Sequence, residues 1–307
     1  MNILVLGKAK TGTSYISKCL QNALLPCDYH LEPKEGKFFF ERTKSRSSGN
    51  RVVKIIFEHW NSKPHLRKAI LCNETDLKFD RKVVIVRDPR DEMISRLMYL
   101  IYAHFLHQGF DPELLESWLA TLKAKEDDPQ AHSFLSLKAE LDRLIGRPNR
   151  PWHDALVFQY AEFIHNISDH AFVVRYEDFI DGRHDELSAY LGFLPDPRLN
   201  QKEALIVRTK RSGTHGNWKE FFTGEDIEFL RPRIGGLMAD MGYHDWELEP
   251  KSTLDHATYS DYVERLAGMA RRDKAREGIA RTGIVRFLDR LGWLLTLRRR
   301  MGVPERY

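Results

Sequence analysis

The chain has 307 residues, of which 42% are hydrophobic and 30% are charged, and its formal net charge at pH 7 is +4. This length and apolar content predict a globular protein with a sizeable core, in one large domain or two. The small positive excess suits an anionic ligand but falls well short of a protein that coats nucleic acid, and three cysteines without a metal-binding spacing predict reduced thiols and no disulfide framework.

Four short apolar runs without alternation are typical of strands buried on both faces of a parallel sheet. These runs are residues 3–6, 52–57, 82–86 and 171–175. Helix-length segments lie between them, at 13–24, 91–108, 112–125, 131–145 and 152–167. Because strands and helices alternate, the sequence predicts a three-layer α/β fold with a central parallel sheet flanked by helices.

A glycine-rich turn, LGKAKTGTSYI, joins the first strand to the first helix. Such a turn presents backbone N–H groups and the positive end of a helix dipole to an anion, although turns of this kind also occur without a ligand. A nucleoside triphosphatase has a lysine after the second glycine, but here Thr13 and Ser14 follow Gly12. Lys10 lies earlier, at the crown of the loop, and Thr11 adds a hydroxyl. This arrangement fits a smaller anion that leaves without a metal.

A second anion site is predicted after the strand at 82–86, where the sequence continues RDPRDEMIS. Arg87 and Ser95 are eight residues apart across a strand-to-helix turn, so both can reach one phosphate, the arginine as a bidentate fork. The alternative is that Arg87 pairs with Asp88 or Asp91 and only stabilises the turn.

A third segment, KRSGTHGNWKEFFT at residues 210–223, holds Arg211, Ser212 and Gly213. Together the three segments resemble the sulfotransferases that use 3′-phosphoadenosine 5′-phosphosulfate (PAPS). AKTGTSY is similar to their 5′-phosphosulfate loop, with Lys10 on the loop lysine. Arg87 and Ser95 fall on their 3′-phosphate motif, and the third segment resembles the one that closes over that phosphate, with Ser212 where lysine is frequent.

This resemblance covers residues 6–223 and implies a P-loop-like fold, PAPS as co-substrate and no metal. It implies binding of PAPS by Lys10, by the rest of the glycine loop and by the second and third segments. We therefore expect a catalytic domain over residues 1–250 and a helical extension over 251–307. A P-loop small-molecule kinase and a non-catalytic module that binds an anionic ligand are the alternatives.

The resemblance also suggests the catalytic groups. Cytosolic sulfotransferases use a histidine two residues after a lysine, but here Ile56 follows Lys54. The heparan-sulfate-type branch uses a glutamate ahead of a Phe-Phe pair, and Glu35 has this position. We expect Glu35 to be the general base, Lys54 to hold the sulfonate and Lys10 to stabilise the leaving phosphate. Glu32, Glu58 and His59 are alternative bases.

The acceptor is expected to be a hydroxyl, or less favourably an amine, of a saccharide or glycolipid, and no nucleic-acid partner is expected. The apolar run at 3–6 is too short for a signal peptide, and no run reaches the roughly 18 to 20 residues of a spanning helix, so we expect a soluble cytoplasmic protein. In residues 281–300, apolar residues recur at helical spacing between arginines. Such a helix suits peripheral membrane contact, or docking on its own domain or on a second subunit.

Overall fold

The fold is given by a computed structural model that describes residues 1–33, 35–40, 49–60, 62–147, 170–199 and 203–276. The helix expected at 152–167 and the arginine-rich segment at 281–300 lie outside the described residues. Within the described part of the chain, no helix is both long enough and apolar enough to cross a membrane.

Among the described residues, five parallel strands form one sheet in the order β2-β3-β1-β4-β5. They are β1 (Asn2–Gly7), β2 (Asp28–Leu31), β3 (Arg51–Ile56), β4 (Arg81–Val86) and β5 (Phe172–Arg175). The four apolar runs are confirmed as strands, and the α/β fold with a central parallel sheet is confirmed with them. β2 was not predicted, because its sequence DYHL is polar and lies partly exposed at the edge of the sheet.

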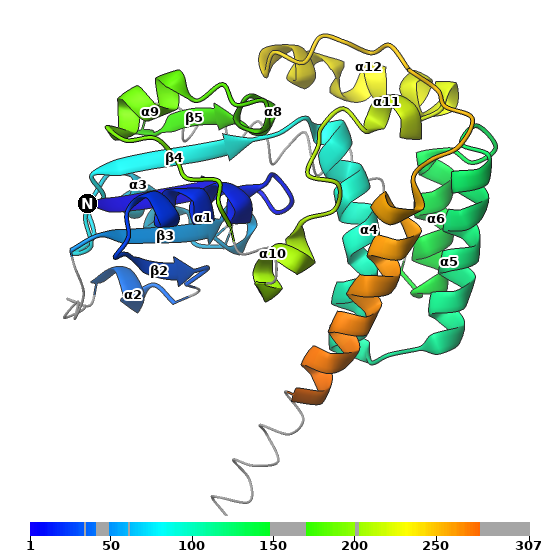
Figure 1. Ribbon diagram of the computed structural model, residues 1–307, viewed down its shortest axis with the longest axis horizontal. Helices are drawn as coiled ribbons and strands as arrows, with labels where there is room; N and C mark the ends of the chain where they lie inside the picture. The colour runs from blue at the N-terminus through cyan, green and yellow to red at the C-terminus, as the bar shows by residue number, and fades with distance from the viewer. Residues whose placement is uncertain (34, 41–48, 61, 148–169, 200–202, 277–307) are drawn as a thin grey trace, which may run out of the picture.

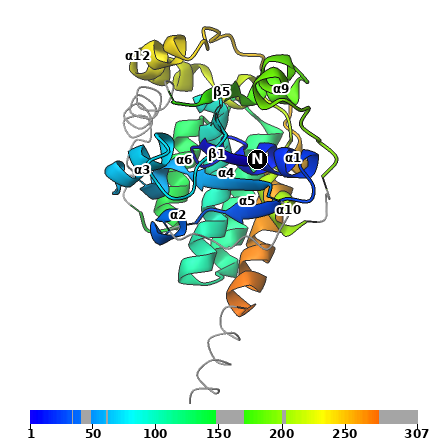
Figure 2. The same cartoon turned by 90° about the vertical axis from the view of Figure 1, so that its left-hand side faces the viewer.

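Alternate side chains of each central strand enter two different cores, as expected for a sheet covered on both faces. Ile3 and Val5 pack against α1 (Thr13–Ala23), α8 (Tyr176–Ile180) and α9 (Asp185–Leu191). Leu4 and Leu6 face the opposite layer, which contains α3 (Pro64–Leu71) and α4 (Pro89–Gln108). Figures 1 and 2 show these two layers on either side of the sheet.

The remaining helices gather beyond the carboxyl ends of the strands, beside α4 (Figure 1). They include α5 (Pro112–Asp127), α6 (Phe134–Leu144), α11 (Trp218–Phe221) and α12 (Gly224–Asp240). Further short helical segments are α2 (Lys37–Phe40), η1 (Phe57–Trp60), α10 (Ala204–Thr209) and η3 (His256–Thr258). Sequence signals set several of these starts: Asp88, Asp111 and Ser133 each cap a helix by accepting a backbone N–H.

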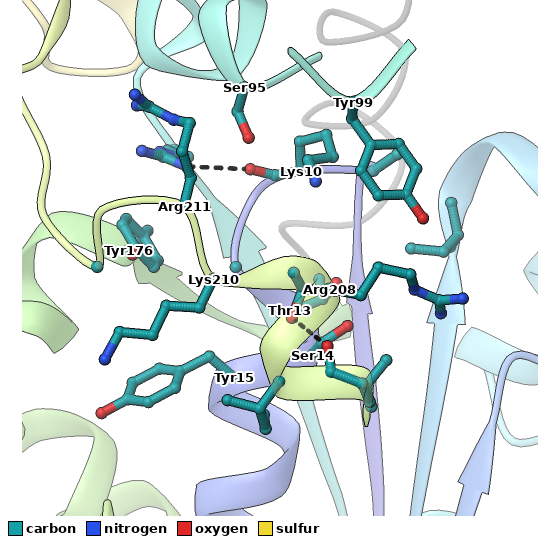
Figure 3. A pocket seen from close by; sticks show the side chains of 18 of the residues that line it. Lys10, Thr13, Ser14, Tyr15, Ser95, Tyr99, Tyr176, Arg208, Lys210 and Arg211 are labelled. Atoms are coloured by element: carbon teal, nitrogen blue, oxygen red, sulfur yellow. Dashed lines mark hydrogen bonds between the residues drawn. The ribbon is translucent and has the colours of Figure 1, made fainter. Parts of the chain in front are cut away.

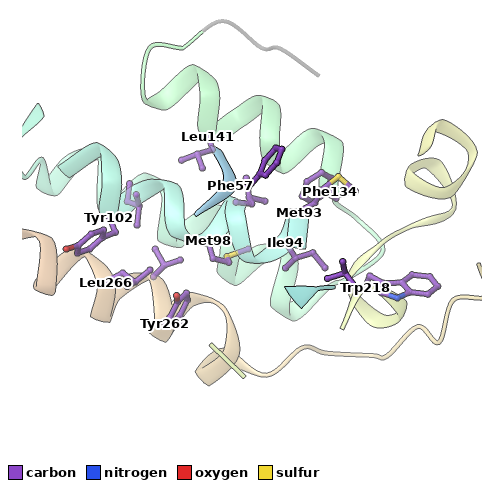
Figure 4. Packing of buried hydrophobic residues seen from close by; sticks show 14 of the residues in the cluster. Phe57, Met93, Ile94, Met98, Tyr102, Phe134, Leu141, Trp218, Tyr262 and Leu266 are labelled. Carbon is purple, nitrogen blue, oxygen red and sulfur yellow. The ribbon is translucent and has the colours of Figure 1, made fainter. Parts of the chain in front are cut away.

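Residues 260–276 form a further helix, which runs along α4. Its Tyr262 and Leu266 are fully buried in the same cluster as Met98 and Tyr102 of α4 (Figure 4). The described part of the expected extension, residues 251–276, therefore shares the core of the preceding residues instead of standing apart from it.

Candidate active site

A cavity of about 340 Å³ opens at the carboxyl end of β1. The loop after β1, the end of β3, the first turns of α4 and the segment at 205–214 line it (Figure 3). β1 pairs with β3 on one side and β4 on the other, so the cavity lies where the strand order reverses, which is the usual ligand site of an open α/β sheet.

The glycine loop is shaped by Gly12, whose φ of 85° lies in the left-handed region that favours glycine. A Cβ at this position would lie 2.3 Å from Cδ2 of Tyr176, so the tyrosine ring packs directly on the loop backbone. Thr13 and Ser14 begin α1 and line the cavity. Thr11 does not line it, because its hydroxyl donates to a carbonyl within the loop at 2.8 Å.

Lys10 lies in the cavity with its Nζ 3.8 Å from the ring centroid of Tyr99. Burial lowers the pKa of Lys10 well below its usual value of 10.5, and neighbouring positive charges lower it further. Those charges belong to Arg87, Arg211, Arg208 and Arg96. A bound anion would relieve this repulsion, so the cluster is electrostatically suited to one.

Arg87 is buried at the end of β4 and joins the two neighbouring loops. Its Nη1 donates to the Lys10 carbonyl at 3.3 Å, and its Nη2 lies 3.4 Å from the Thr214 carbonyl and 3.5 Å from Asp91 Oδ2. Arg87 and the buried Ser95 both line the cavity. Arg87 therefore stabilises the turn and also faces the predicted anion site. Its alternative partner, Asp88, pairs with another arginine of the same turn.

The third segment is anchored over the cavity by Asp91, which accepts the backbone N–H groups of Gly216 at 2.7 Å and Trp218 at 3.1 Å. Within this segment Arg211 donates from Nη2 to Asn217 at 3.1 Å. Its Nε and Nη1 are buried and have no hydrogen-bond partner among the described residues. Because unpartnered buried donors are costly, this guanidinium is suited to an anionic ligand.

Ser212 and Gly213 continue the lining beside Arg211. Gly213 has a φ of 75°, a conformation that favours glycine. The Ser212 hydroxyl accepts the Thr214 N–H at 3.2 Å. The structure thus brings Ser212 and Gly213 to the cavity that Lys10 also lines.

At the β3 side of the cavity, Lys54 donates from Nζ to Oε1 of Glu32. Burial lowers the pKa of Lys54, and the nearby Glu32 carboxylate opposes this shift. Nδ1 of His59 lies 3.9 Å from the other carboxylate oxygen of Glu32. Lys54, Glu32 and His59 all line the cavity.

Glu35, the expected base, is not at the cavity. Its side chain is 68% exposed and pairs with Lys37 at 2.9 Å. The turn before α2 places Phe39 in the core and leaves Glu35 at the surface. The structure therefore does not bring Glu35 to the other predicted site residues; the glutamate that lines the cavity is Glu32, three residues earlier.

A buried charge network supports the loop from behind, and the sequence did not predict it. Lys8 is fully buried and lies 3.2 Å from Glu92, which also pairs with Arg96 at 2.7 Å. Arg96 reaches Glu58 at 3.2 Å, and both oxygens of Glu58 accept the N–H of Ala9 at 3.1 Å. Glu58 was an alternative base, but these contacts make it a support of the loop.

Other side chains of the cavity were missed by the sequence analysis, among them Tyr99 of α4 and Arg208 of α10. Neither belongs to a recognised motif, and only the folded structure brings them to the loop. Among the described residues, no three His, Cys, Asp or Glu side chains lie close enough together to hold a metal ion.

No protein-family model matches the chain, and no curated protein matches its sequence. Among solved structures, a mouse sulfotransferase complexed with PAP matches over 79% of this chain and 87% of that chain. The sequence identity is 13% and the TM-score is 0.41. At this score the two structures differ too much for residue positions to be carried from one to the other.

Proposed function

We propose that the protein is a sulfotransferase that uses PAPS as its sulfuryl donor. The observation that carries the proposal is one cavity in which a displaced loop lysine, Lys10, meets two arginines, the buried Arg87 and the partly buried Arg211. The unpartnered N–H groups of Arg211 and the mutual repulsion of these cations support a ligand that carries several negative charges.

The residues divide into two groups that fit the two ends of such a donor. Arg87, Ser95 and Arg211 would hold the 3′-phosphate. The backbone N–H groups that open α1, together with Lys10, would hold the 5′-phosphosulfate, because a helix N-terminus favours an anion. The donor supplies a sulfonate whose bond to a 5′-phosphate oxygen breaks as a bond from sulfur to the acceptor oxygen forms.

Glu32 is our candidate for the general base. Lys54 fixes one of its carboxylate oxygens, and the other faces His59 and the cavity, where it can take the proton of an acceptor hydroxyl. Lys54 would balance negative charge on the sulfonate oxygens, and Lys10 the charge on the phosphate that leaves.

The rival proposal of a P-loop kinase fits these residues less well. Thr13 occupies the position where the kinase lysine would follow the second glycine. Asp88, at the end of β4, caps α4 and pairs with Arg90 at 2.7 Å, so its carboxylate is already engaged. These contacts favour the sulfotransferase proposal.

Calorimetric titration tests the proposal with PAP (3′,5′-diphosphoadenosine) and with ATP plus magnesium. We expect PAP to bind more tightly, and Arg211→Gln to weaken PAP about 10- to 100-fold through the loss of charged hydrogen bonds. Arg198→Gln is the matched control, because Arg198 is 88% exposed and pairs only with Asp196 in the contacts that we describe. Tight binding of ATP with magnesium and none of PAP would reject the proposal.

A further inference from the structure

Arg208 is a third arginine of the cavity, and it faces a different side from Arg211. In Figure 3 its side chain points away from Arg211 and Tyr176 and toward the side where Tyr99 lies. Its charge contributes to the lowered pKa of Lys54 as well as to that of Lys10, whereas Arg87 and Arg211 act on Tyr176. Arg208 therefore belongs to the Lys54 side of the cavity, where the acceptor would enter.

Two helices hold Arg208 in place. Its Nη1 donates to the hydroxyl oxygen of Tyr102 at 3.0 Å, and that hydroxyl donates to Asp273 at 2.8 Å. Tyr262 donates its hydroxyl to the backbone carbonyl of Arg208 at 2.9 Å. Side chain and backbone are thus both fixed from α4 and from the helix at 260–276.

One N–H group of this guanidinium makes no hydrogen bond to the described residues. Nε of Arg208 is buried and has no hydrogen-bond partner within the described part of the chain. A positioned arginine with a spare donor is suited to a carboxylate, sulfate or phosphate group.

The charge of the cavity lining also favours anionic ligands. As far as the chain is described, the lining contains six cationic side chains and one carboxylate, Glu32, which pairs with Lys54. PAPS carries a charge of about −4 at neutral pH, because a terminal phosphate contributes up to about −2. The charge of the donor therefore does not exceed that of the lining, and Arg208 is outside the set of side chains proposed to hold its two phosphorylated ends.

We propose, on the basis of the proposed sulfotransferase function, that Arg208 binds a negatively charged group of the acceptor. The substrate class is then an alcohol that carries a carboxylate, sulfate or phosphate near the hydroxyl that receives the sulfonate. Asp273 is a positioning residue, since it acts on Arg208 through Tyr102.

The test compares matched acceptors with radiolabelled PAPS. The pairs are 4-nitrophenyl β-D-glucoside with 4-nitrophenyl β-D-glucuronide, 4-(hydroxymethyl)benzamide with 4-(hydroxymethyl)benzoate, and glycerol with glycerol 3-phosphate. We expect the anionic member to have a kcat/KM at least about 10-fold higher, the value of one charge-assisted hydrogen bond. Arg208→Gln should bring the ratio near one by raising KM for the anionic member, with PAP affinity within about threefold of the unmodified protein.

Two further variants separate binding from folding. Arg208→Lys should keep part of the preference, because it keeps the charge and loses the fork. Asp273→Asn should weaken the preference through KM while leaving kcat near the unmodified value, an effect that a loss of stability alone would not produce.

Three results would overturn the inference while PAP still binds: equal use of both members, a preference that survives Arg208→Gln, or no transfer to any anionic alcohol. A loss of kcat with every acceptor in Arg208→Gln would also overturn it and would place Arg208 on the sulfonate. Failure of PAP to bind at all would instead remove the proposed function.

Discussion

Lys10 combines a left-handed backbone, with φ of 73°, and a side chain surrounded by cations. Holding a lysine in this environment is unfavourable unless a ligand compensates for it. The burial and the neighbouring arginines favour the neutral amine in the empty site, and a bound phosphate favours the ammonium. Binding of an anion should therefore be coupled to uptake of a proton.

The first prediction is that PAP affinity falls as pH rises between about pH 7.5 and about pH 9.5, where the ligand phosphates no longer titrate. The pKa of Lys10 is lowered in the empty site, so its ammonium is lost first there, and binding must restore it. Calorimetry in two buffers of different ionisation enthalpy would measure the proton uptake. Lys10→Arg is the control, because arginine stays charged and should remove the pH dependence. The same pH dependence in Lys10→Arg would assign it to another group.

The second prediction separates the two glutamates. Glu32→Gln should lower kcat about 10²- to 10⁴-fold, the usual contribution of a general base, and leave PAP affinity nearly unchanged. Glu35→Gln is the control, because it makes the same chemical change three residues further along the chain. Since the side chain of Glu35 is exposed, this variant should keep kcat within about twofold of the unmodified protein. Transfer from radiolabelled PAPS to the best acceptor of the panel would measure both. A large loss in Glu35→Gln alone would restore the original assignment.

At the scale of elements, the glycine loop depends on α4 and η1 as much as on its own sequence. Glu92 and Arg96 are one helical turn apart on α4, and Glu58 belongs to η1. Together with Lys8 they link the end of β1 to both elements. A buried network of this kind fixes a loop only while every charge has its partner.

The third prediction concerns this network. Glu92→Ala should lower the free energy of unfolding by about 3–5 kcal/mol, because it leaves the buried ammonium of Lys8 without its carboxylate. The double variant Lys8→Met with Glu92→Leu should recover the part of that loss that comes from Lys8, since apolar side chains of similar size need no partner, while Arg96 keeps its contact with Glu58. Urea unfolding measures both. A double variant that is less stable than Glu92→Ala would mean that the ion pair itself is the stabilising feature.

The fourth prediction concerns the contact between the loop and α8. Gly12→Ala should weaken PAP binding and stability, because the new Cβ would overlap the ring of Tyr176. Gly182→Ala is the control: Gly182 has a similar φ of 79°, but no atom of the described residues lies within 4 Å of the added Cβ. The difference between the two variants in thermal unfolding and in PAP affinity isolates the ring contact from backbone strain. Equal effects would show that strain alone matters.

For the whole molecule, the sequence predicted the features that follow from short-range pattern. Dense apolar runs indicated the strands, and the resemblance of the loop motifs implied that Lys10 and Arg87 bind the same ligand. The pattern pointed to Glu35, which lies away from the cavity, because a local pattern does not say which side chain faces the cavity. The pairing of the strands determines which glutamate reaches the cavity. Leu31 of β2 lies beside Lys54 of β3, so the next residue, Glu32, reaches the lysine.

The features that the sequence did not predict depend on contacts between distant segments. Arg208 is held in place by Tyr102, which lies 106 residues before it in the chain. Tyr102 is in turn bound by Asp273, on the helix at 260–276. No motif joins these positions, and their convergence follows only from the packing of that helix on α4. The helix at 260–276 therefore helps to position a side chain of the cavity and also contributes to the core.

This integration leads to the last prediction, which concerns the helix at 260–276. Leu266 is fully buried in the cluster that also holds Met98, so Leu266→Ala should lower the free energy of unfolding by about 2–5 kcal/mol. Glu264 lies on the exposed side of the same helix, so Glu264→Ala should change the free energy of unfolding by no more than about 0.5 kcal/mol. Denaturant unfolding followed by tryptophan fluorescence would report on the whole core through the buried Trp118 and Trp218.

If Leu266→Ala unfolded the helix in a separate early transition and left the main transition unchanged, residues 1–250 would fold without it. A single shifted transition would mean that the helix, and with it the position of Arg208, depends on the same cooperative core as the sheet.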